Sequence, residues 1–284
     1  MDFPDVNTKV VAIIGNPIRH SLSPIIHNTA FQAQKLNYIY IAIDLVTKNL
    51  PKALEGIKAL GFSGLNVTIP YKEAVLPYLE SLSEVAQYTG AVNTIVCNND
   101  HLYGDNTDVS GFLSPIQDFQ LSGMPMTILG AGGAARAVAY ALLREFNPQP
   151  LTIVARRVNQ AQKIANDMDG LGHQVEVSDF ETATAVIKKS RLIVNSTPVG
   201  MFPHVDETPW INGQIFSPDQ VVYDLVYRPN KTRLLRQAEL QGATIIGGLE
   251  MLIQQAAAAY RQWTNHEMPI SIVQNTLMNK FCPQ

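Results

Sequence analysis

A glycine-rich turn between a strand pattern and a helix pattern is the first place where this sequence could do chemistry. Residues 130–135 read GAGGAA and match G-x-G-x-x-A, directly after the apolar stretch MTIL and before an Ala-rich helix pattern. In such a turn the first glycine allows the tight bend, the second lets the backbone approach a pyrophosphate, and the small last residue permits close helix–strand packing. The helix N-terminus offers free N–H groups to the phosphates. A simple turn is the alternative, but this context favours dinucleotide binding.

Two arginines follow the next strand pattern, LTIVA. Arg156 and Arg157 stand where a fold that prefers NAD presents an acidic residue to the ribose 2′-hydroxyl. A guanidinium group is permanently charged and carries a planar set of donors, which suits the 2′-phosphate of NADP. We therefore predict NADP as the cofactor, with two solvated surface arginines as the alternative interpretation.

A pair of serines precedes the first predicted helix. Ser21 and Ser23 lie two residues apart in GNPIRHSLSP, and the helix pattern begins near Pro24. If the turn keeps both side chains on one side, their hydroxyls can donate to one carboxylate. The alternative is that Ser23 alone caps the helix.

Further polar residues stand near the ends of predicted strands in the first third of the chain. Taken singly, each is an ordinary loop residue, and Lys72 is a surface lysine. They are Asn66, Thr68 and Lys72 in NVTIPYKE, Asn93 in AVNT, and Asp108 in GDNTDVSG.

The elements that must position these residues form two α/β series. The first has strand patterns over 9–15, 38–45, 64–70 and 91–96, helix patterns over 24–36, over 50–60 and after Pro70, and a hairpin ending at Asp105. Its β-branched residues suggest buried parallel strands. The second begins at MTIL and continues through LTIVAR, HQVEVS, RLIVNST, QVVYDLVY and ATIIGG. That series is typical of a doubly wound sheet.

Composition argues against several classes of function. A net charge of −3 and a pI near 6.1 provide no basic surface for nucleic acid. No apolar run approaches the roughly 18 residues of a membrane span, and the N-terminal residues lack the basic segment of a signal peptide. We therefore expect a cytoplasmic protein without a membrane partner. Cys97, Cys282 and the six histidines lack metal-ligand spacing, so we expect two free thiols and no metal.

The order of motifs along the whole chain resembles the shikimate dehydrogenase family. The shared segments are GNPIxHSxSP, NVTxPxKE, GAxNT, GDNTDxxG, GAGGAxRA, NxTPxGM, YDxxY and GxxMLxxQA. Two departures stand out. The family usually reads Asn-Arg-Thr after the second strand of the cofactor domain, with another arginine three residues on, whereas residues 155–160 read ARRVNQ; and Glu250 stands where members often have glycine.

The resemblance implies an oxidoreductase that reversibly reduces 3-dehydroshikimate to shikimate with NADPH, in the chorismate route to aromatic amino acids. Lys72 and Asp108 would be the catalytic pair at the reacting carbon, and Ser21 and Ser23 would hold the substrate carboxylate. The ring hydroxyls would contact Asn66, Thr68, Asn93 and Gln255, with Tyr227 also facing the substrate. The residues proposed for the cofactor are Gly130, Ala131, Gly132, Gly133 and Ala134 at the pyrophosphate, Arg156 and Arg157 at the 2′-phosphate, and Asn195, Thr197, Leu225 and Gly248 along the path to the nicotinamide.

We predict an α/β protein with two domains, because 284 residues exceed the usual size of one core. Residues 1–112 would form the substrate-binding and catalytic domain, and 113–246 a Rossmann-type doubly wound NADP-binding domain. Residues 247–284 show helix patterns over 249–263 and 271–280, which we expect to pack on the first domain. A homodimer is an expectation from the family alone.

Two alternatives stay open. One is a quinate/shikimate dehydrogenase of broader specificity that can use NAD, which the serine pair and the arginine pair disfavour. The other is a catalytically inactive relative that senses a metabolite. Lys72 and Asp108 disfavour the second, because a sensor need not keep a proton donor.

Overall fold

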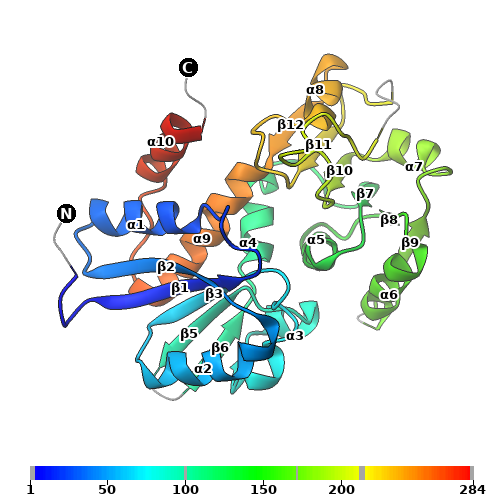
Figure 1. Ribbon diagram of the computed structural model, residues 1–284. Helices are drawn as coiled ribbons and strands as arrows, with labels where there is room; N and C mark the ends of the chain where they lie inside the picture. Colours follow the sequence, from blue (N-terminus) through cyan, green and yellow to red (C-terminus); the bar gives the residue numbers. More distant parts are fainter. Residues whose placement is uncertain (1–3, 99–100, 171, 211–214, 282–284) are drawn as a thin grey trace. The chain divides into compact units, whose positions relative to one another are not determined.

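The computed structural model describes residues 4–98, 101–170, 172–210 and 215–281 (Figure 1). The chain divides into two compact units. The first unit comprises Met1–Asp108 and Ile253–Gln284, and the second unit comprises Val109–Leu252. Among the described residues, no helix combines the length and the apolar character that crossing a membrane requires.

The first unit is built on a mixed sheet of order β2-β1-β3-β5-β6-β4. Its strands are β1 (Lys9–Gly15), β2 (Tyr38–Asp44), β3 (Gly64–Val67), β4 (Ser81–Leu82), β5 (Thr94–Asn98) and β6 (His101–Asp105). β1 is parallel to β2 and β3, whereas β5 is antiparallel to both of its neighbours. The expectation of parallel strands is therefore wrong for β5. The hairpin predicted to end at Asp105 is confirmed by β5 and β6, because so short a connection can join only antiparallel strands.

The helices of the first unit flank this sheet. They are α1 (Ser23–Ala33), α2 (Leu50–Ala59), α3 (Glu84–Thr89), α10 (Ile270–Phe281) and most of α9 (Gly248–Thr264), with 3₁₀ turns η1 (Thr47–Asn49) and η2 (Leu76–Tyr78). The helix predicted after Pro70 is reduced to η2 and turns. Pro77 lies inside that segment and cannot donate a backbone hydrogen bond, which prevents a longer helix.

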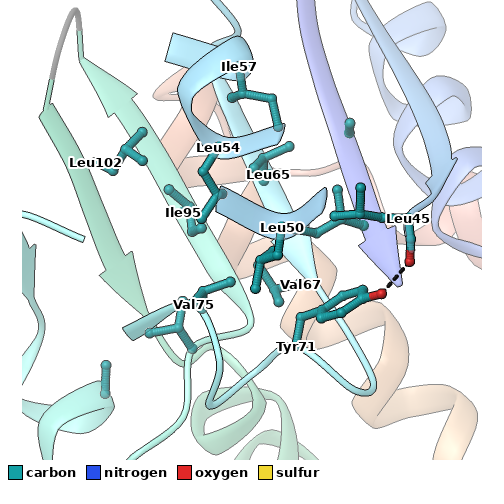
Figure 2. Close-up of a cluster of buried hydrophobic side chains, with 14 residues drawn as sticks. Leu45, Leu50, Leu54, Ile57, Leu65, Val67, Tyr71, Val75, Ile95 and Leu102 are labelled. Carbon is teal, nitrogen blue, oxygen red and sulfur yellow. Dashed lines mark hydrogen bonds between the residues drawn. The ribbon is translucent and has the colours of Figure 1, made fainter. Parts of the chain in front are cut away.

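α2 covers one face of the sheet, as Figure 2 shows. The buried side chains on this face include Leu50, Leu54, Ile57, Leu65, Val67, Tyr71, Val75, Ile95 and Leu102. The Tyr71 hydroxyl donates to the carbonyl oxygen of Leu45 at its margin. Since successive strand residues point to opposite faces, Gly64 and Asn66 of β3 point away from α2.

The opposite face carries an aromatic cluster around His27 of α1. The His27 ring stacks on Tyr40 of β2 with centroids 4.4 Å apart and lies 5.2 Å from the ring of Trp263 in α9. Trp263 needs the glycine at position 64, because a Cβ there would lie 2.1 Å from its Nε1 atom. The same nitrogen donates to the carbonyl oxygen of Ile95 at 3.0 Å, so α9 is fixed to this face of the sheet.

His27 makes the stability of the first unit sensitive to acid. Its ring is fully buried without a hydrogen-bond partner among the described residues, and burial lowers its pKa to about 3 from 6.5. Below pH 6.5 the imidazole of His27 is protonated in the unfolded chain but stays neutral in the folded chain. The free energy of unfolding is therefore highest above pH 6.5 and falls as the pH decreases toward 3. The expected loss by pH 4.5 is about 3 kcal/mol from this group.

Urea unfolding between pH 4.5 and 7.5 measures this effect. The His27→Phe variant should show a flatter dependence of the free energy of unfolding on pH than the wild type, whatever its absolute stability. Substituting the exposed His20 by Phe is the control. Equal slopes for wild type and His27→Phe would contradict the prediction.

The second unit contains a fully parallel sheet of order β12-β11-β10-β7-β8-β9. Its strands are β7 (Met126–Leu129), β8 (Leu151–Val154), β9 (Val175–Ser178), β10 (Leu192–Asn195), β11 (Val221–Asp224) and β12 (Thr244–Gly247). Its helices are α5 (Gly133–Phe146), α6 (Val158–Asp169), α7 (Thr184–Lys189), α8 (Arg233–Leu240) and all but the first residue of α4 (Asp108–Leu113), with the 3₁₀ turn η3 (Ser114–Ile116). Three strands extend to each side of the point between β7 and β10, which confirms the predicted doubly wound order.

Candidate active site

Strand direction gathers the predicted substrate residues of the first unit at one edge of its sheet. β1 and β3 are parallel and end there, and β5, which is antiparallel to β3, begins there. β6 ends at the same edge, with Asp105 opposite Thr94. Side chains that are far apart in sequence therefore meet beyond these strand ends.

Lys72 and Asp108 form an ion pair at this edge, with 2.5 Å between Nζ and Oδ2. Their side chains are 28% and 14% exposed, so the lysine keeps some access to solvent. The carbonyl oxygen of Lys72 accepts from the backbone N–H of Val92, and the N–H of Asp108 donates to Oδ1 of Asn106. Because an ammonium carries three N–H donors, Lys72 retains donors for a ligand.

Asn93 fixes the other oxygen of the Asp108 carboxylate. Its Nδ2 atom donates to Oδ1 of Asp108 at 2.7 Å, and Oε1 of Gln255 in α9 lies 3.5 Å from the same nitrogen. Its Oδ1 atom accepts from the backbone N–H of Thr107 at 2.8 Å. Asn93 is only 3% exposed, so the orientation of Asp108 is set from inside the protein.

Asn66 and Thr68 stand at the end of β3. Asn66 is 5% exposed and accepts a hydrogen bond from the hydroxyl of Tyr40 at 2.7 Å. Thr68 packs against the end of β1, where a Cβ on Gly15 would lie 2.5 Å from the Thr68 methyl group. A larger residue at position 15 would therefore displace Thr68.

Ser21 and Ser23 lie at the start of α1. Oγ of Ser21 accepts from the backbone N–H of Ser23 at 3.3 Å, and the Ser21 hydroxyl hydrogen has no acceptor among the described residues. The alternative of helix capping by Ser23 is wrong, because Leu22 occupies the N-cap position and no side chain there caps the helix. Both hydroxyls thus belong to the first unit, together with Asn66, Thr68, Lys72, Asn93, Asp108 and Gln255.

The glycine-rich turn of the second unit joins β7 to α5. Gly130 has φ +106°, and a Cβ there would lie 2.8 Å from Oγ of Ser196, so only glycine fits this bend. At Gly132 and Gly133 an added Cβ would meet no atom within 4 Å. Ala135 is fully buried against the sheet. The open space above these glycines and the start of α5 fit a pyrophosphate, and Ala131 and Ala134 lie in the same turn.

Arg156 and Arg157 follow the buried Ala155 at the end of β8. Both are exposed, and neither guanidinium forms an ion pair with a residue that the structure describes. Arg157 occupies the N-cap position of α6. Two cations without compensating acids at the end of this strand fit an anionic ligand.

A buried hydrogen-bond network joins β10 to β11. Nδ2 of Asn195 donates to Oδ1 of Asp224 at 2.8 Å, and Oδ1 of Asn195 accepts from both the backbone N–H and the hydroxyl of Thr197. Burial raises the pKa of Asp224 to about 6, while hydrogen bonds from Thr232, the N–H of Val226 and Asn195 oppose that shift. The sequence motif YDxxY contains Asp224, but we predicted no role for it.

Leu225 and Gly248 approach each other closely in the second unit. The backbone N–H of Leu225 donates to the carbonyl oxygen of Asn195 at 3.0 Å. A Cβ on Gly248 would lie 2.2 Å from the Leu225 carbonyl oxygen, so this contact requires glycine. Tyr227 also belongs to the second unit, where burial raises its pKa.

Family models match three successive parts of the chain. Residues 13–95 match the shikimate dehydrogenase substrate binding domain, 115–201 the model described as shikimate / quinate 5-dehydrogenase, and 248–278 the shikimate 5′-dehydrogenase C-terminal domain. A shikimate dehydrogenase (NADP(+)) from Salinibacter ruber is 52% identical, and the match covers 96% of this chain and 98% of the relative. The chain belongs to the shikimate dehydrogenase family.

Solved shikimate dehydrogenases share the fold. One, in complex with NADP+, has a TM-score of 0.93 at 37% identity, over 98% of each chain. Another, from Listeria monocytogenes in complex with shikimate and NAD, has a TM-score of 0.91 at 34% identity, over 98% of this chain and 99% of the other. The predicted fold class and the predicted family are both confirmed.

Proposed function

We propose that this chain catalyses the reversible reduction of 3-dehydroshikimate to shikimate with NADPH, a step toward aromatic amino acids. The observation that carries the proposal is the Lys72–Asp108 ion pair in a chain of this family, with its carboxylate held by Asn93. A protein that only sensed a metabolite would have no need for this proton donor.

The proposed chemistry assigns the proton to the protein. NADPH, when bound, supplies the hydride that reduces the ring ketone. Nζ of Lys72 donates a proton to the oxygen that gains charge during reduction, and it takes one back in the reverse direction. Asp108 orients the ammonium and binds a neighbouring hydroxyl. Because Asn93 holds one carboxylate oxygen and Lys72 the other, the pair is oriented before the substrate arrives.

The other proposed contacts are those that the resemblance to the family implies. Ser21 and Ser23 hold the substrate carboxylate, and the ring hydroxyls contact Asn66, Thr68, Asn93 and Gln255, with Tyr227 also facing the substrate. For NADP, the turn over 130–134 holds the pyrophosphate, Arg156 and Arg157 hold the 2′-phosphate, and Asn195, Thr197, Leu225 and Gly248 line the path to the nicotinamide. A cytoplasmic location and a homodimer remain expectations of the same proposal.

Product analysis tests the reaction. Incubation with 3-dehydroshikimate and NADPH should convert both in equal amounts and yield shikimate, identified by chromatography against the authentic compound. Binding of 3-dehydroshikimate without consumption of NADPH would instead support the sensor alternative.

The arginine pair predicts the cofactor preference. Replacing both Arg156 and Arg157 by alanine removes the charge-assisted hydrogen bonds to a 2′-phosphate, so kcat/KM for NADP+ should fall by about 10- to 100-fold. The value for NAD+ should stay nearly constant, because NAD lacks that phosphate. Lys163→Ala, which removes another exposed cation from α6, is the control. Parallel losses with both cofactors would contradict the assignment.

A broader quinate/shikimate dehydrogenase is the second candidate. Two observations favour keeping it: one matched family model includes quinate dehydrogenases, and the Listeria relative was solved with NAD. Activity with quinate or NAD+ comparable to that with shikimate and NADP+ would select this candidate.

A further inference from the structure

The hydroxyl of Tyr40 contacts Asn66, which we propose to bind a ring hydroxyl of the substrate. It donates to Oδ1 of Asn66 at 2.7 Å. Tyr40 itself is only 2% exposed. We infer that Tyr40 is a positioning residue, which fixes the Asn66 amide for a ring hydroxyl of the substrate without touching the substrate. This inference rests on the proposed function.

The hydrogen bonds of Asn66 determine which way its amide points. Nδ2 donates to the backbone carbonyl oxygen of Asn93 and to Oγ1 of Thr94, both at 3.1 Å. A carbonyl oxygen can only accept, so the amide nitrogen must face Asn93 and the amide oxygen must face Tyr40. Tyr40 is therefore the donor in its bond to Asn66.

This arrangement leaves Asn66 one way to meet a ligand. Both amide hydrogens are used within the protein, and one lone pair of Oδ1 is used by Tyr40. The remaining lone pair can only accept, so the group that it recognises must be a donor. A ring hydroxyl of shikimate satisfies this requirement, whereas a ketone or a carboxylate at the same place does not.

Tyr40 is held firmly enough to act in this way. The side-chain amide of Asn28 bonds to both the N–H and the carbonyl oxygen of Tyr40, each at 2.9 Å. On its face, the ring of His27 is stacked with an interplanar angle of 6°. A backbone clamp and a stacked ring fix the hydroxyl, as a rigid support for a binding residue requires.

Tyr40→Phe tests the inference by removing only the hydroxyl. The Asn66 oxygen would lose its partner and the amide could rotate, so the KM for shikimate should rise by about tenfold, the upper range for one hydrogen bond. The kcat should stay within about twofold and the KM for NADP+ should not change, because neither proton transfer nor the cofactor depends on Asn66. Since KM does not depend on the amount of active enzyme, partial loss of folded protein would not hide the effect.

Tyr38→Phe is the matched control. Tyr38 lies on the same strand, and its hydroxyl donates to the carbonyl oxygen of Trp263 at 3.0 Å rather than to a proposed binding residue. The substitution removes the same atom from the same strand. A role of Tyr40 in stability alone would make the two variants alike in their KM for shikimate.

A double-mutant cycle with Asn66→Ala shows whether Tyr40 acts through Asn66. If it does, Tyr40→Phe should add little to the KM of the Asn66→Ala enzyme. If the wild type turns over shikimate, either of two results would overturn the inference and leave the proposed function intact. One is a KM for shikimate that is unchanged in Tyr40→Phe, and the other is full additivity of the effects of Tyr40→Phe and Asn66→Ala on that KM. A wild type without shikimate turnover would overturn the proposed function and this inference together.

Discussion

Replacing Lys72 by methionine should lower kcat by about 10²- to 10⁴-fold, the usual effect of removing a general acid–base group. Methionine keeps an unbranched side chain but has no proton to give. Asn93 still holds Asp108 in the variant, so the substrate site should keep its shape. The affinity for shikimate should therefore change by no more than a few fold, measured as KM and as the dissociation constant from calorimetry.

Lys58→Met provides the control for this substitution. Lys58 is also half-buried and paired with a carboxylate in the first unit, with 2.6 Å between Nζ and Oε1 of Glu80, but it carries no proposed role. Its variant should retain the kcat of the wild type. A Lys72→Met enzyme with kcat within about fivefold of wild type would refute proton transfer by Lys72, since general acid–base groups contribute far more than that.

Gly248→Ala should destabilise the second unit by about 3 kcal/mol or more, at the upper end of overpacking effects. The added Cβ would lie 2.2 Å from the carbonyl oxygen of Leu225 and 2.4 Å from its carbonyl carbon. These are backbone atoms that cannot rotate away, so β11 or the start of α9 must move. Because Leu225 and Gly248 are proposed to line the cofactor path, the KM for NADP+ should rise as well.

Gly170→Ala is the matched control in the same unit. Gly170 ends α6 with φ −58°, and an added Cβ would lie 3.4 Å from the nearest atom, an ordinary contact. Thermal unfolding should therefore shift strongly for Gly248→Ala and little for Gly170→Ala. Similar melting temperatures for both variants would show that the space around Gly248 is not as tight as the structure has it.

Local sequence patterns predicted the elements of the second unit well. Five of its six strands are short and mostly apolar, and β9 alternates apolar and polar residues. The glycines of the turn at Gly130 likewise indicate its tight geometry. The first unit was less predictable, because strand direction depends on connections rather than on composition. That is why the antiparallel β5 was not foreseen. The helix predicted after Pro70 was wrong for another reason, because the prediction did not take account of Pro77.

The candidate site depends on contacts that spacing alone does not reveal. Lys72 and Asp108 are separated by 36 positions, and only the family resemblance predicted that they would act together. Nothing in the sequence indicated a role for Tyr40 in the site, since a tyrosine in a strand is ordinarily interpreted as a packing residue. The position of Asp224 could have been recognised, because an acidic residue in an apolar strand indicates a buried hydrogen-bond partner, here Asn195.

The most direct test of the account is the kcat/KM of the purified protein with shikimate or quinate, each with NADP+ or NAD+, followed by the absorbance of the reduced nicotinamide. The account predicts that the combination of shikimate and NADP+ exceeds the other three by at least about tenfold, the effect of one lost charge-assisted contact. Four values at background, with shikimate still bound in calorimetry, would contradict it.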